Sequence, residues 1–478
     1  MSLHPSLLLA EFALRLFVAC LVLLRKGRRP SVAMAWILAV IAIPVAGLIA
    51  YFLVGENNFG RRRAARHAAI LREVDRPEVH APGDPRARLL RLDPGQTQLA
   101  RLAESVSHGP ALAGNALELS GDSAANIDAM ARDIDAARAH VHLLTYIYLL
   151  DASGKRIAQA LLGAAKRGVT VRLLVDGVGS KAFLRSDLRR TLEAGGVRVA
   201  EALPVSLLRL AVARLDIRNH RKLLVVDGVI AWMGSQNVAD ASFAPKARYA
   251  PWVDCMVRVR GPLVRELQLV FVEDWYMEHQ EDLDPTLNVQ PEFDASGMTA
   301  QVVATGPNFG NDSMTTLLQA AVHLAREEIV LTTPYYVPDP PMQAALAVAA
   351  RRGVRVHLVV PRRNDSWLVQ RASRAFYGDL LHADVTIHEF TGGLLHAKTM
   401  VVDRMTSVVT SANLDRRSFE INFEMGVLVY DAAFCERLRQ LQETYMSRSL
   451  RVDRATWELR PLGRRLLEST AGLLSPLL

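Results

Sequence analysis

Hydrophobic residues occur along this chain in two ways, as long stretches near its start and as short runs after it. Residues 7–24 are apolar except for Glu11 and Arg15, and residues 31–54 contain no charged side chain. From residue 106 onward the apolar runs are short, rich in Val, Ile and Leu, and separated by Gly or polar residues. Short buried strands alternating with helices give this second pattern, so it predicts an α/β body.

The two N-terminal stretches predict a helical hairpin, residues 1–56, that inserts into a membrane. Residues 31–54 are long enough to cross a bilayer, whereas residues 7–24 are marginal and either span or lie in the interface. Glu11 and Arg15 stand one helical turn apart and are expected to pair. Basic residues follow each stretch, so the charge rule for membrane orientation leaves the side of the body open.

The α/β region repeats itself. The segment AARAHVHLLTYIY (136–148) matches LAREEIVLTTPYY (324–336), and AAKRGVTVRLLVD (164–176) matches AARRGVRVHLVVP (349–361). The second pair of segments gives a helix end, a Gly suited to cap it, and a strand. Strand–helix–strand order in both copies predicts parallel-rich sheets with right-handed crossovers. We therefore expect two similar halves, residues 106–290 and 291–456.

Two further segments flank these halves. Residues 57–105 are basic and rich in proline and are expected to form a linker. Residues 457–478 place arginines beside a run of leucines. They predict an amphipathic C-terminal tail, which either lies on a membrane or docks on the body as a terminal helix.

The chemistry is concentrated in a motif that also occurs twice. Each copy reads H-x-K-x4-D, followed by a Ser-x-Asn pair, and the copies consist of His220, Lys222, Asp227, Ser235 and Asn237, and of His396, Lys398, Asp403, Ser411 and Asn413. On a strand, residues i and i+2 face the same side, so each His points with its Lys. One copy alone would be explained by an exposed strand with a structural turn. Two copies favour one composite site between the halves, in which imidazole, ammonium and amide groups handle a phosphodiester.

Composition changes this picture only slightly. There are 57 basic and 49 acidic residues, a net charge of +8, which suits an anionic partner, either lipid headgroups or nucleic acid. Aromatic residues make up 6%, few for stacking on bases, and the apolar N-terminus also argues against nucleic acid. The three cysteines, Cys20, Cys255 and Cys435, have neither ligand nor disulfide spacing. We expect no metal and no cofactor, and no pattern indicates an oligomeric state.

The duplicated HxKxxxxD motif resembles the signature of the phospholipase D superfamily. The segments TYIY, RNHRKLLVVDG, TGPNFGNDSM, TTPYYVPD and SANLDRRSFEINFEMGVLVYD resemble its bacterial cardiolipin synthase branch from end to end. The resemblance implies two phospholipase D-like α/β/α sandwich halves with pseudo-twofold symmetry, preceded by a transmembrane hairpin in the bacterial inner membrane, as a multi-pass protein. One departure is Thr410, where the family has Gly.

The same resemblance implies the reaction and the role of each residue. Two phosphatidylglycerol molecules would give cardiolipin and glycerol through a phosphatidyl-histidine, without a metal. By analogy His220 is the nucleophile and His396 the acid/base, although the sequence alone does not order the two. Lys222, Lys398, Asn237, Asn413, Ser235 and Ser411 would bind the phosphate, Asp254 and Glu424 would orient the histidines, and Asp227 and Asp403 would act as turn acids that bond the backbone or Lys. A phospholipase D hydrolase, a nuclease and a scaffold without activity are the alternatives.

Overall fold

The computed structural model describes residues 5–24, 30–43, 45–51, 65–66, 69, 80, 83–204, 216–281, 283, 286–287, 289–307, 313–473 and 475. The chain forms two units. One consists of residues 1–65 with 205–217, and the other of residues 66–204 with 218–478.

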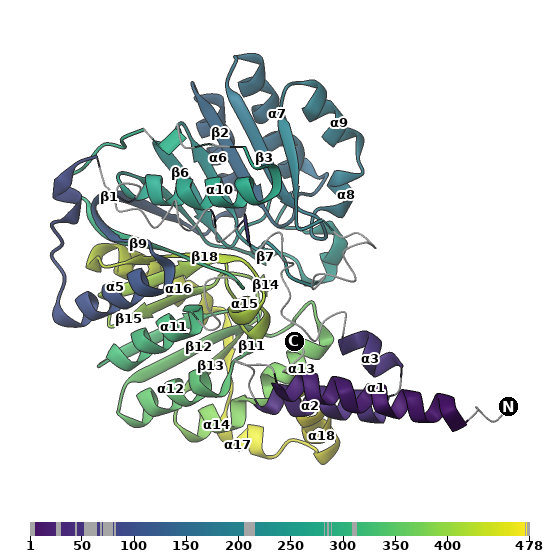
Figure 1. The fold of residues 1–478 in the computed structure, drawn as a ribbon. Helices are drawn as coiled ribbons and strands as arrows, with labels where there is room; N and C mark the ends of the chain where they lie inside the picture. The colour runs from purple at the N-terminus through teal and green to yellow at the C-terminus, as the bar shows by residue number, and fades with distance from the viewer. Residues whose placement is uncertain are drawn as a thin grey trace. The chain divides into compact units, whose positions relative to one another are not determined.

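The larger unit is built on one sheet whose strands come from both halves of the repeat (Figure 1). The strands before residue 290 are β1 (Ala111–Ser120), β2 (His140–Thr145), β3 (Thr170–Asp176), β4 (Arg198–Ala202), β5 (Leu223–Val226), β6 (Ile230–Gly234) and β8 (Met256–Arg260). Those after it are β9 (Met298–Thr305), β10 (Glu328–Thr332), β12 (Arg355–Pro361), β13 (Thr386–Phe390), β15 (Thr399–Val402), β16 (Thr406–Thr410), β18 (Glu424–Val429) and β19 (Ser449–Arg451).

The order of these strands shows the pseudo-twofold relation that the repeat predicts. From the middle outward the first half runs β1-β8-β6-β5-β2-β3-β4, and the second runs β9-β18-β16-β15-β10-β12-β13 before ending in β19. The halves meet where β1 pairs antiparallel with β9, with Ala111 opposite Gln301. Each strand of the first half thus has a counterpart in the second, and the sheet runs through both.

The prediction of parallel-rich sheets was wrong. Within this sheet, parallel pairing is confined to β2-β3-β4 and β10-β12-β13, and the other neighbours are antiparallel. The strand–helix–strand segments on which the prediction rested form only these two parallel blocks. The motif segments instead form tight hairpins, β5–β6 and β15–β16, and hairpins pair antiparallel.

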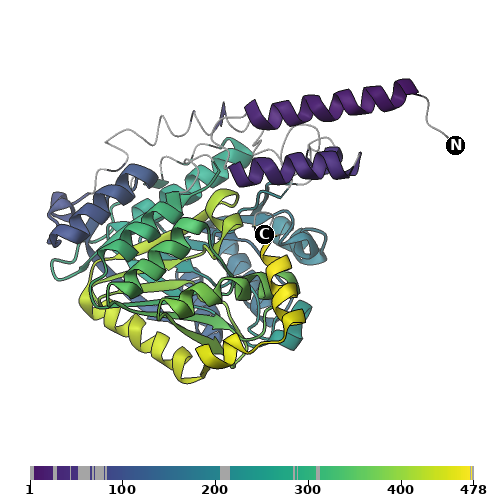
Figure 2. The same ribbon diagram turned by 90° about the horizontal axis from the view of Figure 1, so that it is seen from below.

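Helices cover both faces of the sheet (Figures 1 and 2). They are α5 (Pro94–Ser107), α6 (Ser123–Asp135), α7 (Ala152–Lys166), α8 (Lys181–Leu184), α9 (Asp187–Ala194), α10 (Leu263–His279), α11 (Ser313–Leu324), α12 (Pro340–Arg351), α13 (Trp367–Ala375), α14 (Tyr377–His382), α15 (Arg416–Glu420), α16 (Ala432–Ser447), α17 (Arg454–Glu458) and α18 (Leu462–Leu473), with the 3-10 turns η2 (Pro85–Arg88) and η4 (Ala244–Tyr249). Two small sheets pair β7 (Trp252–Val253) with β14 (Leu394–Leu395), and β11 (Tyr336–Val337) with β17 (Leu414–Asp415).

Alternate residues of the central strands enter different cores, as the two-residue period of a strand requires. In β5, Leu223 and Val225 pack with α10, whereas Leu224 and Val226 pack with α6 and α7. In β15, Val401 packs in the core shared by both halves, and its neighbours on either side pack with α11 and α12. Both halves are therefore α/β/α sandwiches, and the core that contains α10 and α16 is continuous between them.

Helix α5 lies inside the segment that was expected to be a linker. It begins at Pro94 after the cap Asp93, and Asp93 and Gln96 form a reciprocal capping box. Leu99 and Ala103 are buried in the core of the second half. The expectation of a linker up to residue 105 was wrong for this part. Proline in this segment indicated a loop, but Pro94 stands in the first turn of a helix, where proline is favoured.

The C-terminal helix α18 docks on α13, which is one of the two outcomes that the sequence left open. Ala471 is buried against Ala372, and the side chain of Glu468 is buried and accepts from Arg460 and Arg464. The same helix leaves Leu462, Leu466 and Leu473 exposed.

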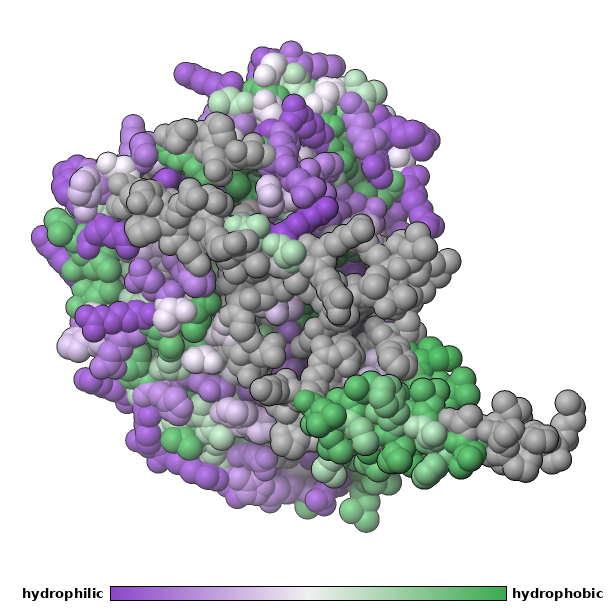
Figure 3. All heavy atoms as spheres, in the orientation of Figure 1, coloured by the Kyte–Doolittle hydropathy of each residue, from purple (hydrophilic) through white to green (hydrophobic). Residues whose placement is uncertain are grey.

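The smaller unit contains α1 (Pro5–Leu24), α2 (Pro30–Ala42) and α3 (Ala46–Ala50). Glu11 and Arg15 pair at 2.6 Å, as the sequence predicts. Hydrophobic side chains gather over these helices (Figure 3), and Phe12 and Phe17 are among those exposed. Residues 31–54 do not form the single long helix that was expected, since α2 ends at Ala42. Within the described ranges, no helix combines the length and the apolar character that crossing a bilayer requires.

Candidate active site

Both His-Lys pairs lie at the start of a hairpin, one in each half of the sheet. His220 and Lys222 immediately precede β5, and His396 and Lys398 immediately precede β15. The backbone N–H of His220 donates to Phe423 O of the second half at 2.9 Å, and that of His396 donates to Val253 O of the first half at 2.8 Å. Each half thus holds the other half's histidine by its backbone, and the two motif copies meet.

The motif aspartates occupy the turns of these hairpins. Asp227 accepts the backbone N–H groups of residues 138–140 at 2.7–2.9 Å, and Asp403 accepts those of residues 326–328 at 2.8–2.9 Å. Both residues have positive φ values, 54° and 50°. Their carboxylates therefore fix the start of β2 and of β10. They bond the backbone rather than the motif lysines, which was one of the two possibilities left by the sequence.

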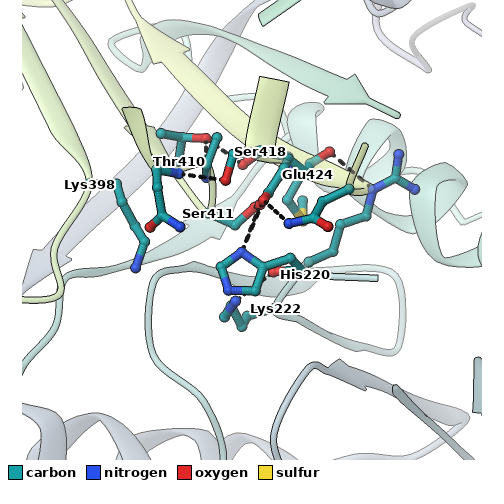
Figure 4. A network of polar contacts seen from close by, with 12 residues as sticks. His220, Lys222, Lys398, Thr410, Ser411, Ser418 and Glu424 are labelled. Carbon is teal, nitrogen blue, oxygen red and sulfur yellow. Dashed lines mark hydrogen bonds and ion pairs between the residues drawn. The ribbon is translucent and has the colours of Figure 1, made fainter. Parts of the chain in front are cut away.

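The histidines and the acids pair across the two halves. His220 Nδ1 lies 3.0 Å from Glu424 of the second half, and His396 Nδ1 lies 2.7 Å from Asp254 of the first half. The sequence named both acids but did not say which histidine each contacts. A carboxylate on Nδ1 fixes the tautomer and leaves Nε2 for chemistry. Figure 4 shows the second ring nitrogen of His220 turned away from Glu424.

The motif serines bond these same acids. Ser235 Oγ donates to Asp254 at 2.6 Å. Ser411 Oγ donates to Glu424, also at 2.6 Å (Figure 4). The sequence assigned the serines to phosphate binding. In the structure the hydroxyls are engaged with carboxylates, so what they do directly is to hold the acids in position.

Burial dominates the electrostatics of the two lysines. Lys222 and Lys398 are almost fully buried, and each Nζ donates to the carbonyl of its own histidine. Burial lowers the pKa of Lys222 to about 8, although Glu424 and Asp254 oppose the change. Burial together with repulsion by Lys222 lowers the pKa of Lys398 well below its usual value. An anion between the two lysines would relieve both effects.

The histidines are neutral at pH 7. Burial lowers the pKa of His220 and of His396 to about 4, and the neighbouring lysines contribute to the decrease. Burial alone would raise the pKa of Asp254 and Glu424, but their contacts with the histidines and lysines lower it overall. Each pair thus consists of a neutral imidazole and a carboxylate, which leaves a lone pair on the free ring nitrogen.

The two asparagines lie beside the site, Asn237 shortly after the end of β6 and Asn413 shortly after the end of β16. Asn237 Oδ1 accepts the backbone N–H of Ile147 at 3.1 Å, and this contact leaves its amide N–H groups available. Asn413 is buried and its amide oxygen has no hydrogen-bond partner among the described residues. These side chains supply amide groups beside the His-Lys pairs.

Thr410 has a structural counterpart on the neighbouring strand. In the first half Gly234 faces Met256, and a Cβ at Gly234 would lie 2.3 Å from Cys255 O. In the second half the sizes are reversed, because Thr410 faces Gly426. Thr410 Oγ1 donates to Met425 O at 2.9 Å and accepts from Ala412 N at 3.0 Å. The small residue of this cross-strand pair is thus on β6 in the first half and on β18 in the second half.

Sequence reasoning missed three side chains around the histidines. Arg221 is buried and bonds Glu424 O, Thr305 O and Asp274, which ties the Glu424 strand to α10. The Tyr146 ring lies edge-on to His220 at 4.9 Å, and the Trp252 ring lies 4.6 Å from His396, between ring centroids. Tyr146 belongs to the TYIY segment and Trp252 lies two residues before Asp254, but the sequence does not show that either ring contacts a histidine.

No cluster of three or more His, Cys, Asp or Glu side chains with the spacing of a metal site occurs in the described part of the chain. The positive groups around the two histidines are the ammonium groups of Lys222 and Lys398. The arrangement can bind a monoanionic phosphodiester, attack it from one neutral imidazole and transfer a proton with the other.

A fold of two phospholipase D-like halves with two His-Lys sets at one site defines a phosphodiester-transferring enzyme of the phospholipase D type. Residues 130–275 and 318–445 match the family described as cardiolipin synthase, PLD-like domain, and residues 16–56 match the phospholipase D-nuclease N-terminal family.

Relatives that match almost the whole chain show which branch of this class the chain belongs to. The chain is 37% identical over 460 residues to cardiolipin synthase A of Yersinia pseudotuberculosis, covering 95% of both chains, and 37% identical over 470 residues to the same protein of Yersinia pestis, again covering 95% of both. Phosphatidylserine synthase of Haemophilus influenzae has the same fold, with a TM-score of 0.60 and 13% identity over 80% of this chain and 98% of that one. The chain belongs to the bacterial cardiolipin synthases of the phospholipase D superfamily.

Proposed function

We propose that this phosphatidyltransferase joins two phosphatidylglycerol molecules into cardiolipin and releases glycerol. The observation that carries the proposal is the crossed pairing of the two histidines with Glu424 and Asp254. Neither half contains a complete His–acid pair of its own, so the two motif copies act as one site. A single site with two oriented imidazoles suits an exchange of one alcohol for another on the same phosphorus.

In the first step, His220 Nε2 attacks the phosphorus of one lipid, and the bond from phosphorus to the glycerol oxygen breaks. The bound phosphate raises the pKa of His396, which takes up a proton on Nε2 and gives it to the departing oxygen. Lys222, Lys398, Asn237 and Asn413 donate hydrogen bonds to the non-bridging oxygens, where negative charge develops. In the second step the hydroxyl of another phosphatidylglycerol gives its proton to His396 and attacks phosphorus, and the P–N bond breaks. One phosphodiester replaces another, so no nucleotide is consumed.

Several residues act through others in this proposal. Asp254 and Glu424 orient the imidazoles, Ser235 and Ser411 position these two acids, and Asp227 and Asp403 support the hairpins. The hydrogen bonds given above support each of these roles. Thr410 supports the second hairpin in place of the family's Gly.

The substrates are membrane lipids, and the family is membrane-associated. We assign residues 1–56 to a membrane hairpin that holds the catalytic unit at the bacterial inner membrane, as a multi-pass protein. The apolar stretches 7–24 and 31–54, together with the exposed hydrophobic side chains of α1, support this assignment. The catalytic unit divides at about residue 290 into the two halves, and a terminal segment from residue 457 follows.

Product analysis tests the proposal. Purified protein would be incubated with phosphatidylglycerol vesicles, and the lipids would be identified by mass spectrometry. We expect cardiolipin and glycerol in equal amounts. Phosphatidic acid with glycerol would show a hydrolase, cleavage of DNA without lipid products would show a nuclease, and no product at all would show a scaffold; each of these results would contradict the proposal.

A further inference from the structure

A cavity of about 450 Å³ lies between the halves, outside the His-Lys site. Arg248 and Tyr249, from the 3-10 turn η4 of the first half, form one side. The other side comes from the carboxyl ends of β12 and β13, with Arg362, Arg363 and Phe390. The volume is in the range of about 300–1,000 Å³ that is usual for small-ligand pockets.

The cavity carries positive charge that the described chain does not neutralise. Arg248, Arg362 and Arg363 are exposed, and no described carboxylate forms an ion pair with any of them. Asp365 is close in sequence, but it already accepts from Tyr335 Oη at 2.7 Å and pairs with Lys246. The surroundings therefore favour an anionic ligand.

The first half does not have these arginines at the equivalent edge. In the repeat, Asp176 at the end of β3 corresponds to Pro361 at the end of β12. Asp176 is buried, accepts the backbone N–H groups of Val178, Gly179 and Asn219, and pairs with Arg218 at 3.4 Å. The second half has no acid there, and two arginines follow Pro361 directly. The pseudo-twofold symmetry is thus broken at this edge: among the described residues, Asp176 of the first half is paired with Arg218, whereas Arg362 and Arg363 of the second half pair with no carboxylate.

The cavity adjoins the His396 side of the active site. Gly393 lines the cavity, and the next residue, Leu394, donates to Pro251 O at 2.9 Å. Strands β7 and β14 pair here (Figure 1), with Leu394 opposite Trp252. The Trp252 ring in turn lies 4.6 Å from the His396 ring, between centroids. A short, fixed path therefore joins the arginines to His396.

We infer that this cavity binds the phosphodiester of the second lipid, the one whose hydroxyl attacks the phosphatidyl-histidine. The inference rests on the proposed function and deepens it. In an in-line displacement the entering alcohol approaches phosphorus from the side opposite the histidine bound to it. The acceptor's own phosphate lies one glycerol unit beyond the attacking oxygen, and a guanidinium group is well suited to bind such a phosphate.

This placement also assigns the histidines. An acceptor held on the His396 side gives its proton to His396, and phosphorus is then attached to His220. As the hydroxyl oxygen bonds to phosphorus, the P–N bond breaks and its electron pair returns to Nε2 of His220. The arginines hold the attacking hydroxyl near phosphorus, so they favour transfer to the lipid over hydrolysis by water.

The test compares two acceptors in one vesicle assay. Full-length protein receives phosphatidylglycerol with 1-butanol, so that cardiolipin and phosphatidylbutanol form in competition. We expect Arg362→Gln/Arg363→Gln to lower the ratio of cardiolipin to phosphatidylbutanol at least about tenfold, because butanol carries no phosphate for the arginines to bind. Arg132→Gln, on an exposed position of α6, is the matched control and should keep the wild-type ratio.

Other outcomes decide against the inference. An unchanged ratio, or an equal loss of both products in a variant whose thermal unfolding matches the wild type, overturns it. If the double variant does not fold, Arg248→Gln gives the same comparison from the other wall of the cavity. Inorganic phosphate and extra phosphatidylglycerol would also be added in equal amounts. If phosphate lowers cardiolipin formation by more than the added lipid raises it, the cavity is a site for free phosphate instead. A wild type that makes phosphatidylbutanol but no cardiolipin would contradict the proposed function itself.

Discussion

Lys222 and Lys398 carry charges that the fold keeps from water and close to each other. Burial is the first cause of the lowered pKa of both lysines and both histidines. A phosphate between them supplies the negative charge that burial and repulsion make favourable. The lysines and histidines of the free site therefore bind fewer protons than those of the occupied site. Substrate binding raises their pKa values, and the site takes up protons that the reaction uses later.

This predicts proton uptake when an anion binds. Sulfate does not titrate near neutral pH, so any protons taken up must reach the protein. At pH 8, near the pKa of about 8 of Lys222, binding raises that pKa and adds up to about half a proton at this residue. Calorimetry in buffers of different ionisation enthalpy measures the uptake, which should decrease in Lys222→Met. Zero uptake or proton release on binding would contradict the account.

The exchange between Thr410 and Gly426 predicts a size-dependent coupling. A Cβ on Gly426 would lie 3.1 Å from Thr410 Cβ, and the two hydrogen bonds of Thr410 Oγ1 prevent it from moving aside. Gly426→Ala should lower the free energy of unfolding by about 1–3 kcal/mol, the usual cost of overpacking. Adding Thr410→Gly should recover part of this loss.

Gly378→Ala is the matched control, since nothing lies within 4 Å of a Cβ there and the residue is in helix α14. Denaturant unfolding of the wild type, Gly426→Ala, Thr410→Gly and the double variant gives the coupling energy between the two positions. Additive effects of the two substitutions on the free energy of unfolding would show that the side-chain sizes at residues 410 and 426 are independent.

At the level of elements, the membrane hairpin predicts how the protein is held. The proposed hairpin, residues 1–56, lies outside the catalytic unit, so its deletion should leave that unit folded. The truncated protein should lose integral membrane behaviour and keep only a salt-sensitive attraction to anionic vesicles through its basic residues.

Carbonate extraction of membranes compares the two proteins. The full-length chain should stay in the pellet and the truncated chain should be released. Equal release of both would mean that α1, α2 and α3 are core or interfacial helices.

The hairpins β5–β6 and β15–β16 could be predicted because their β-branched runs and turn acids are local signals. The composite site could be predicted because the motif is duplicated. The pairing of His220 with Glu424 could not, since it depends on how two halves distant in sequence meet across β1 and β9. Helix α5 was missed although its start, Asp93-Pro94 with Gln96, is a local signal. The dominance of antiparallel pairs was missed because the order of strands in a sheet is set by tertiary packing.

At the scale of the whole molecule, protein side chains rather than a metal ion are expected to stabilise the negative charge of the phosphate. Two lysines and two amides surround the phosphate, so cardiolipin formation should persist in excess EDTA. The assay uses phosphatidylglycerol vesicles with a non-chelating buffer as control. Loss of activity that one specific divalent ion restores would contradict this account of charge stabilisation, whereas a general effect of divalent ions on lipid packing would occur with any of them.

The central claim is that both halves act on one phosphorus, with His220 as nucleophile and His396 as acid/base. Trapping the intermediate tests it most directly. His396→Asn and His220→Asn would be incubated with phosphate-labelled phosphatidylglycerol, quenched, and mapped by peptide mass spectrometry. Both variants should lose at least about 100-fold in cardiolipin formation, the lower range for loss of acid–base catalysis. We predict label on His220 in His396→Asn and none in His220→Asn. Label on His396 in His220→Asn, or near-normal cardiolipin formation by either variant, would contradict the account.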